Sequence, residues 1–179
     1  MPGAYGVVTI HRPVNTTPEA LARHVHVLAE LAEELPLVFP MHPRTRNVLG
    51  TSSGDYGALS IVEPLGYLDM LQVLGNARIA ITDSGGLQKE AAFLGVRCIT
   101  LREETEWTET LDMGANVLVG QSVDGLRSTF RACVRNARQP DWAEAVEEHY
   151  GNGEAAINIV NDLVRWTADA VPEKERRQA

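Results

Sequence analysis

This sequence has few cysteines, and its acidic residues outnumber its basic ones. Only two cysteines, Cys98 and Cys133, occur among 179 residues. That is too few for a disulfide framework or a cysteine-rich metal site, and it suits a reducing compartment. The formal net charge is -8. Binding to nucleic acid or to anionic membranes depends on summed basic charge, so we expect neither partner, and any anionic ligand must be held locally.

Long apolar runs and a basic leader are also missing. No stretch approaches the roughly 20 apolar residues that a membrane-spanning helix needs. The opening MPGAYGVVTI lacks the basic region and apolar core of a signal peptide, which favours a cytoplasmic protein. The hydrophobic content of 44% suits one globular domain, which we expect over residues 1–171. Residues 172–179 are polar and are expected to form a disordered tail.

Short apolar segments alternate with helical patterns along the chain. Six segments rich in β-branched residues predict strands: Tyr5–Ile10, Leu37–Met41, Leu59–Val62, Arg78–Thr82, Arg97–Leu101 and Asn116–Val119. The first helix should open at a capping box of Thr16 and Glu19. His24 and His26 fall off its apolar stripe and are expected to be solvated. This alternation predicts an α/β domain with a parallel sheet, whose ligands bind at the carboxyl ends of the strands.

The stretch from Ile79 to Leu94 joins a strand to a helix through two glycines. Unpaired backbone N–H groups and the positive end of the macrodipole meet at such a junction, so Ser84, Gly85 and Gly86 suit an anion such as a phosphate. Glu90 lies one turn beyond Gly86 on the same side of the helix, where it could accept hydrogen bonds from a ribose diol. An equally good interpretation is that Glu90 binds no ligand and occurs there only because the helix dipole stabilises a carboxylate in the early turns.

Basic residues gather after the predicted strands of this acidic protein. Arg12, Arg44, Arg46 and Arg102 all follow strands and should therefore share one rim of the sheet. Any one of them is as well explained as an ordinary surface residue. The four together favour a phosphate-bearing ligand, which arginine binds through charge-assisted hydrogen bonds.

Six segments, in matching order, resemble the non-hydrolysing UDP-N-acetylglucosamine 2-epimerase family: HRPVN at His11, HPRTR at His42, EPLGYLDML at Glu63, TDSGGLQKEAAFLGV at Thr82, TLREETEWTET at Thr100 and GANVLVG at Gly114. The resemblance covers nearly the whole chain but only the second half of the family's pattern. Members have two Rossmann-like domains in the GT-B arrangement, with the nucleotide sugar between them. The resemblance therefore implies a Rossmann-like parallel sheet flanked by helices, the C-terminal half of a GT-B fold.

The resemblance also implies roles for individual residues. It gives His11 a catalytic role, as an acid/base or a phosphate-neutralising group. By motif match, the residues that bind UDP are Arg12, Pro64, Leu65, Tyr67, Ser84, Gly85, Gly86 and Glu90. His42, Arg44 and Arg102 are further substrate or regulatory contacts. Many bacterial members have HRREN where this chain has HRPVN, so Val14 replaces a glutamate associated with activation by a second substrate molecule.

The family interconverts UDP-N-acetylglucosamine and UDP-N-acetylmannosamine by eliminating UDP and adding it back to the other face. The resemblance implies no metal and no cofactor, and it implies a homodimer, because members are commonly dimeric. The carboxylates that move the C2 proton belong to the first domain. This chain alone is therefore expected to be inactive, with the missing N-terminal Rossmann-like domain as its partner.

Two alternatives stay open beside the epimerase half. One is a stand-alone nucleotide-sugar binding module, and the other is half of a GT-B glycosyltransferase. The abrupt start at the first strand favours an excised or truncated product over a protein that works alone.

Overall fold

A computed structural model describes residues 3–49, 56–135 and 142–170 of the chain. Contacts divide the chain into two compact units, Met1–Ala143 and Glu144–Ala179, and each is described by itself. The predicted single domain through residue 171 therefore stays a prediction. Its far boundary and the tail over 172–179 lie outside the described residues.

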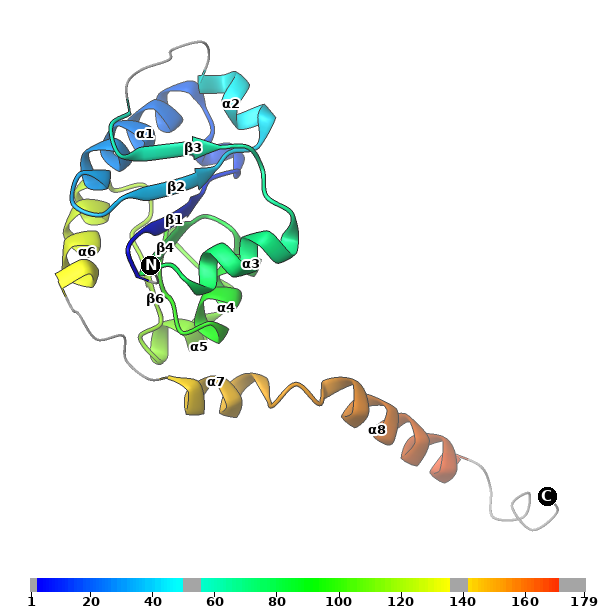
Figure 1. Ribbon diagram of the computed structural model, residues 1–179. Helices are drawn as coiled ribbons and strands as arrows, with labels where there is room; N and C mark the ends of the chain where they lie inside the picture. The colour runs from blue at the N-terminus through cyan, green and yellow to red at the C-terminus, as the bar shows by residue number, and fades with distance from the viewer. Residues whose placement is uncertain (1–2, 50–55, 136–141, 171–179) are drawn as a thin grey trace. The chain divides into compact units, whose positions relative to one another are not determined.

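One six-stranded parallel sheet forms the centre of the first unit, in the order β3-β2-β1-β4-β5-β6 (Figure 1). Every neighbouring pair in this order runs parallel. The strands are β1 (Gly6–Thr9), β2 (Leu37–Pro40), β3 (Leu59–Val62), β4 (Ile79–Thr82), β5 (Arg97–Thr100) and β6 (Asn116–Leu118). All six lie within the segments predicted as strands, which confirms the α/β fold with a parallel sheet.

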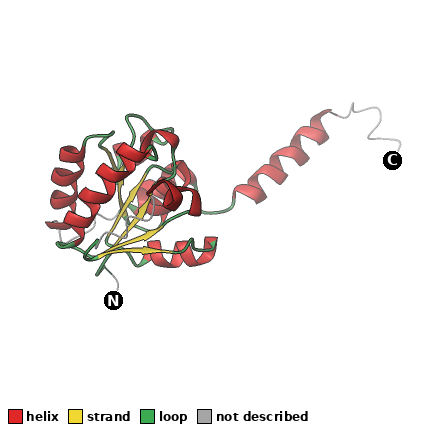
Figure 2. Ribbon diagram, turned by 90° about the horizontal axis from the view of Figure 1, so that it is seen from above, coloured by secondary structure: helices red, strands yellow, loops and turns green. Residues whose placement is uncertain are grey.

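Helices connect the strands and cover both faces of the sheet (Figure 2). They are η1 (Pro13–Asn15), α1 (Pro18–Ala32), α2 (Pro43–Leu49), α3 (Tyr67–Gly75), α4 (Gly85–Phe93), α5 (Thr108–Asp112) and α6 (Val123–Arg135). The helix expected after the double glycine is α4. It closes as predicted at Gly95, whose φ of 69° is a left-handed conformation that glycine adopts without a steric penalty.

Alternating side chains along the central strands build two cores. On β1, Val8 belongs to the core that contains α1 and α6 residues such as Leu28 and Phe130. The preceding Val7 belongs to the opposite core, with Leu74 of α3 and Leu87 of α4. Because successive strand side chains point to opposite faces, an apolar run such as that of β1 serves both cores. The sheet is therefore anchored on both sides, and its carboxyl edge is rigidly placed.

Two details at α1 differ from the sequence predictions. The N-cap is Thr17, whose hydroxyl accepts the N–H of Ala20 at 3.2 Å, whereas the Thr16 hydroxyl donates to the carbonyl of Arg12 at 3.0 Å. The predicted capping box is therefore wrong. His24 is also not solvated: it is only 3% exposed, and desolvation is the largest of the causes that lower its pKa. His26 is exposed, as predicted.

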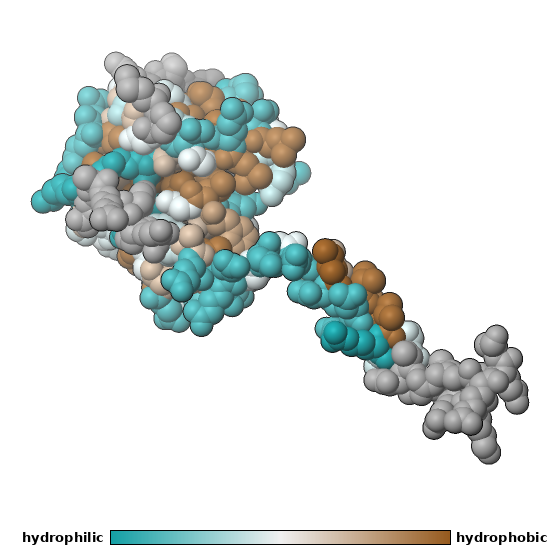
Figure 3. Space-filling model, turned by 60° about the horizontal axis from the view of Figure 1, so that its bottom comes forward, coloured by the Kyte–Doolittle hydropathy of each residue, from teal (hydrophilic) through white to brown (hydrophobic). Residues whose placement is uncertain are grey.

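The second unit contributes α7, which begins at the boundary (Ala143–Tyr150), and α8 (Ala155–Ala170). The apolar residues of α8 are exposed and form a hydrophobic strip along the helix (Figure 3): Ile157, Ile159, Val160, Leu163, Val164 and Trp166. An apolar strip of this kind is typical of a helix that packs against another surface. None of the helices in the described part of the chain is long and apolar enough to cross a membrane.

Candidate functional site

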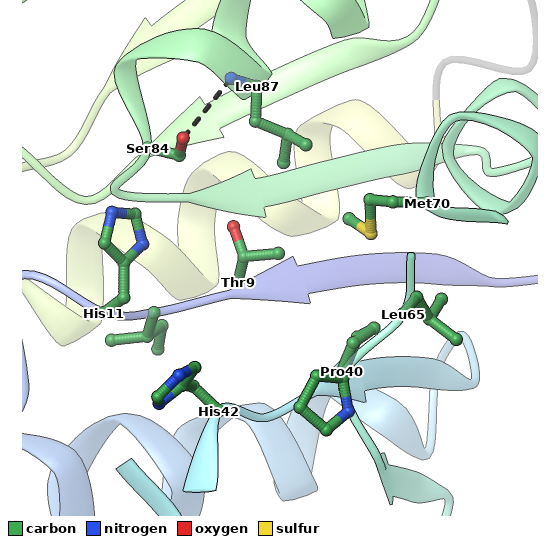
Figure 4. Close-up of a pocket in the computed structure, with 10 residues that line it drawn as sticks. Thr9, His11, Pro40, His42, Leu65, Met70, Ser84 and Leu87 are labelled. Atoms are coloured by element: carbon green, nitrogen blue, oxygen red, sulfur yellow. Dashed lines mark hydrogen bonds between the residues drawn. The ribbon is translucent and has the colours of Figure 1, made fainter. Parts of the chain in front are cut away.

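A cavity of about 290 Å³ opens at the carboxyl ends of the central strands (Figure 4). It lies where β1 and β4 are neighbours, which is the point at which the strand order reverses. Ligands of open α/β sheets bind in the crevice at this switch point. The lining residues come from β1 and β2 with the residues that follow them, the segment after β3, α3 and the start of α4: Thr9, Ile10, His11, Pro40, His42, Pro64, Leu65, Met70, Ser84 and Leu87.

The start of α4 presents free backbone donors beside this cavity. Ser84 is the N-cap, and its hydroxyl accepts the N–H of Leu87 at 3.4 Å. The N–H of Ser84 itself donates to the Thr82 hydroxyl at 2.9 Å. In the described residues, the N–H groups of Gly85 and Gly86 donate to no protein acceptor. Two backbone donors at the positive end of a helix are thus available to an anion.

Asp83 is the centre of the polar contacts beneath the cavity. Its side chain is fully buried and accepts hydrogen bonds from the backbone N–H of His11 at 3.1 Å and of Arg12 at 2.9 Å. The side-chain amide of Asn15 donates to it at 3.0 Å. A buried carboxylate is tolerable only with several such donors. Asp83 therefore fixes the turn that follows β1.

The same carboxylate also orients the His11 ring. Nδ1 of His11 lies 3.0 Å from Oδ1 of Asp83, while the His11 side chain remains 54% exposed and lines the cavity. An acceptor at Nδ1 keeps the proton on that nitrogen. Nε2 is then the ring nitrogen that can accept a proton from a ligand or donate one to it. The pairing is an Asp–His arrangement suited to acid/base work.

Two arginines converge on one carboxylate beside α4. Arg102 donates from both terminal nitrogens to Glu106, at 2.8 and 2.9 Å, and Arg12 lies 3.7 Å from the same carboxylate. The hydrogen bonds from Arg102 are the largest cause that lowers the pKa of Glu106, to about 2. Glu106 is consequently ionised at every ordinary pH, and this part of the site combines two cations with one anion.

A buried hydrogen-bond network attaches the loop after β5 to α4. The Gln88 side chain donates to the carbonyl of Ser84 at 3.0 Å and accepts from the hydroxyl of Thr105 at 2.6 Å and the amide of Asn116 at 3.0 Å. Asn116 in turn accepts from the hydroxyl of Thr100 at 2.7 Å. A network whose members satisfy one another rigidifies its surroundings. It holds the segment that carries Arg102 and Glu106 against the start of α4.

A second cavity of about 320 Å³ adjoins the first and shares His11 and His42 with it. Arg44 also lines this cavity, and its backbone N–H donates to Nδ1 of His42 at 3.2 Å. Arg46 does not extend the basic rim freely, because it pairs with Glu63 at 2.7 Å. Arg46 lines neither cavity, whereas Arg44 lines the second cavity and Arg12 and Arg102 lie beside the start of α4.

The predicted site residues fall into four groups, one of which is Arg44 alone, at the second cavity. Five line the first cavity: His11, His42, Pro64, Leu65 and Ser84. Arg12, Arg102, Gly85 and Gly86 lie at or beside the start of α4. Tyr67 is 65% exposed at the first residue of α3, and neither it nor Glu90 lines the first cavity. Their roles toward a ligand stay predictions.

Sequence reasoning missed the residues that support this site. Asp83 stands next to the predicted Ser84 but received no role, and the Gln88, Thr105 and Asn116 network was not anticipated. The available signal was weak. Asp83 directly follows an apolar strand, where a carboxylate faces the edge of the sheet, whereas Gln88 and Asn116 meet only through long-range packing.

Comparisons with known proteins agree with this geometry. The family model described as UDP-N-acetylglucosamine 2-epimerase matches residues 1–164. The UDP-2,3-diacetamido-2,3-dideoxy-D-glucuronate 2-epimerase of Pseudomonas aeruginosa is 38% identical over 161 residues, which are 89% of this chain and 44% of that protein. The UDP-N-acetylglucosamine 2-epimerase of Methanocaldococcus jannaschii is 35% identical over 167 residues, with the same two coverages of 89% and 44%.

A solved structure of the M. jannaschii enzyme, in complex with UDP-GlcNAc and UDP, matches with a TM-score of 0.72 and 34% identity. The match covers 92% of this chain and 46% of that one. The chain thus spans about half the length of the relatives it matches. Its fold is the Rossmann-like parallel sheet flanked by helices that forms half of a GT-B fold. By the family match over most of its length, the chain belongs to the UDP-N-acetylglucosamine 2-epimerase family.

Proposed function

We propose that this chain is the UDP-binding half of a UDP-N-acetylglucosamine 2-epimerase. The complete enzyme would interconvert UDP-N-acetylglucosamine and UDP-N-acetylmannosamine by eliminating UDP and adding it back. The observation that carries the proposal is the cavity between the ends of β1 and β4, which brings His11 to Ser84 and the free amides of α4. A family relative has been solved with UDP-GlcNAc and UDP bound, which supports the same ligand class here.

In this proposal the start of α4 holds the diphosphate of UDP. The N–H groups of Gly85 and Gly86 and the N-terminal dipole would bind the phosphate oxygens. His11, oriented by Asp83, would neutralise or protonate the phosphate oxygen that departs from the sugar when the C1–O bond breaks. Pro64 and Leu65 also line the cavity, and the uracil would lie beside them.

The proton at C2 of the sugar needs a base from another part of the enzyme. By the family resemblance, those carboxylates belong to the N-terminal half, and the chain spans only 44% of its relatives. The apolar strip of α8, whose members are exposed, also supports a chain that packs against further protein. We propose that the missing half and a second copy of the enzyme are the partners, and that this chain alone turns over no substrate.

The proposal for the UDP moiety does not depend on the identity of the sugar. The substrates in the names of the two relatives differ in the sugar but share UDP. A stand-alone binding module and half of a glycosyltransferase would use the same diphosphate and ribose contacts. The family match favours the epimerase over both alternatives.

Glu90 is the proposed ribose contact, and two observations support that role. No acidic residue lies in the first turn of α4, so Glu90 stands beyond the region where the helix dipole favours a carboxylate. Its side chain also has no hydrogen bond or ion pair to the parts of the chain that the structure describes. A free carboxylate one turn behind the diphosphate donors can accept both ribose hydroxyls.

Glu90→Ala is expected to weaken UDP binding by about 10- to 100-fold, because a hydrogen bond to a charged group contributes about 1.5 to 3 kcal/mol. The loss for 2′-deoxy-UDP or inorganic phosphate should be much smaller, since neither ligand offers the diol. Isothermal titration calorimetry with the three ligands measures this difference. Glu33→Ala is the matched control, because it removes an exposed carboxylate at the C-terminal end of α1 that does not line the cavity. Equal losses for all three ligands would show that Glu90 does not bind the ribose.

A further inference from the structure

The segment after β5 places three polar groups around the first residue of α4. A Cβ atom built on Gly85 would lie 3.6 Å from Oε2 of Glu106, 3.7 Å from Nε1 of Trp107 and 3.9 Å from a terminal nitrogen of Arg102. One carboxylate, one indole donor and one guanidinium are therefore within reach of the same point. That point adjoins the free N–H groups of the helix.

The fork formed by the two terminal nitrogens of Arg102 is already occupied by one anion, Glu106. Its side chain is 9% exposed, and both terminal nitrogens donate to Glu106. The Glu106 side chain, in contrast, is 53% exposed. The carboxylate can therefore swing into solvent at little cost, whereas the guanidinium is fixed by packing. A phosphate presents the same acceptor geometry to an arginine fork, with more charge and a third oxygen.

Trp107 supplies a donor that the protein does not use. Its Nε1 atom is buried and has no hydrogen-bond partner among the described residues. The ring itself is held in place, since the ammonium of Lys89 stacks 3.8 Å from its centroid. An indole nitrogen can only donate, and a buried donor without an acceptor is costly. An anion beside Gly85 would supply that acceptor.

We propose that a phosphate of the ligand displaces Glu106 from Arg102 and accepts the indole N–H of Trp107. The inference rests on the proposed function and extends it with two residues. Glu106 is a built-in competitor for the phosphate position, and Trp107 is a direct ligand contact. Arg12, 3.7 Å from Glu106, is released toward the ligand by the same displacement.

The variant Glu106→Gln distinguishes two roles of this carboxylate: competing with the phosphate for Arg102, or holding Arg102 in place for the ligand. If Glu106 competes with the phosphate, the variant binds UDP and inorganic pyrophosphate about 2- to 10-fold more tightly, a range set by the modest strength of an ion pair whose carboxylate is exposed to solvent. If Glu106 instead holds Arg102 in place for the ligand, the variant binds both more weakly. Glu104→Gln is the matched control, because it removes the same charge from an exposed neighbour of Arg102. Calorimetry on the three proteins gives the comparison.

Trp107→Phe tests the indole contact, because it removes the N–H donor and keeps a smaller aromatic ring for Lys89. The expected result is roughly 10-fold or greater weakening for both ligands, as for a hydrogen bond to a charged group. In the unmodified chain, the indole ¹H–¹⁵N signal of Trp107 should move on titration with pyrophosphate, a readout that needs no variant. An unmoved signal would overturn the contact.

The outcomes distinguish this inference from the proposed function. If the chain binds UDP and pyrophosphate but Glu106→Gln binds them no more tightly than Glu104→Gln, displacement of Glu106 is wrong and UDP binding stands. If the chain binds pyrophosphate but not UDP, while Glu106→Gln tightens pyrophosphate binding, the phosphate position stands and the UDP assignment fails. If neither ligand binds, both proposals fail.

Discussion

Replacing Asp83 by asparagine should lower the free energy of unfolding of this chain by about 2 to 6 kcal/mol, because two or more of the donors around the carboxylate lose their acceptor. The carboxylate is 0% exposed and accepts from the N–H of Arg12, the amide of Asn15, and both the N–H and the ring Nδ1 of His11. Asparagine keeps one acceptor oxygen and points an amide N–H₂ at the remaining donors. Each buried donor left without an acceptor costs about 1 to 3 kcal/mol.

Urea unfolding monitored by circular dichroism measures this loss, and Asp112→Asn is the control. Asp112 is an exposed carboxylate in the last turn of α5, and its replacement should change the free energy of unfolding by less than about 0.5 kcal/mol. Similar losses in the two variants would mean that the contacts of Asp83 do not organise the turn after β1.

The second large effect concerns catalysis. The chain alone should show no epimerisation of UDP-N-acetylglucosamine, because it spans 44% of its relatives and the proposed proton-transfer carboxylates lie in the other half. Exchange of the C2 proton in D₂O, followed by NMR, is the sensitive assay, since it detects proton transfer even when no product accumulates. Exchange should remain at the level of a sample without protein.

Fusion of the chain to the N-terminal half of the M. jannaschii relative, which is named for the same substrate, supplies the positive control. The two sequences are 35% identical over the shared part, so we expect the interface between the halves to form. Exchange by the fusion, but not by the chain, would agree with the proposal. Turnover by the chain alone at a typical enzymatic rate of about 1 to 10³ s⁻¹ would refute it.

Local sequence patterns were enough to predict the sheet and the start of α4. β-branched segments mark all six strands, and the double glycine marks the junction at Ser84, because these features depend on neighbours in sequence. The same reasoning misplaced the cap of α1 by one residue. Thr16 and Thr17 offer the same hydroxyl, and only the path of the chain through η1 decides which of them faces the helix.

The predictions failed where burial depends on distant parts of the chain. His24 lies off the apolar stripe of α1, yet it is buried at 3% exposure in the folded protein. The contact between Arg102 and Glu106 is local in sequence. Its place in the candidate phosphate site depends on Gly85 and Trp107, which packing brings to the same point. Asp83 likewise acquires its role only when β1 and β4 pair and present their ends together.

A titration of the ¹⁵N-labelled chain with UDP tests the central claim most directly, because it reports binding and location together. UDP should move the amide signals of Ser84, Gly85 and Gly86 most strongly, together with those of residues around His11. Uridine, which lacks the diphosphate, should leave the glycine signals unchanged. Saturable shifts centred on the start of α4 are the predicted result. Shifts elsewhere in the chain, or none at concentrations up to millimolar, would contradict the assignment of this domain as the UDP-binding half.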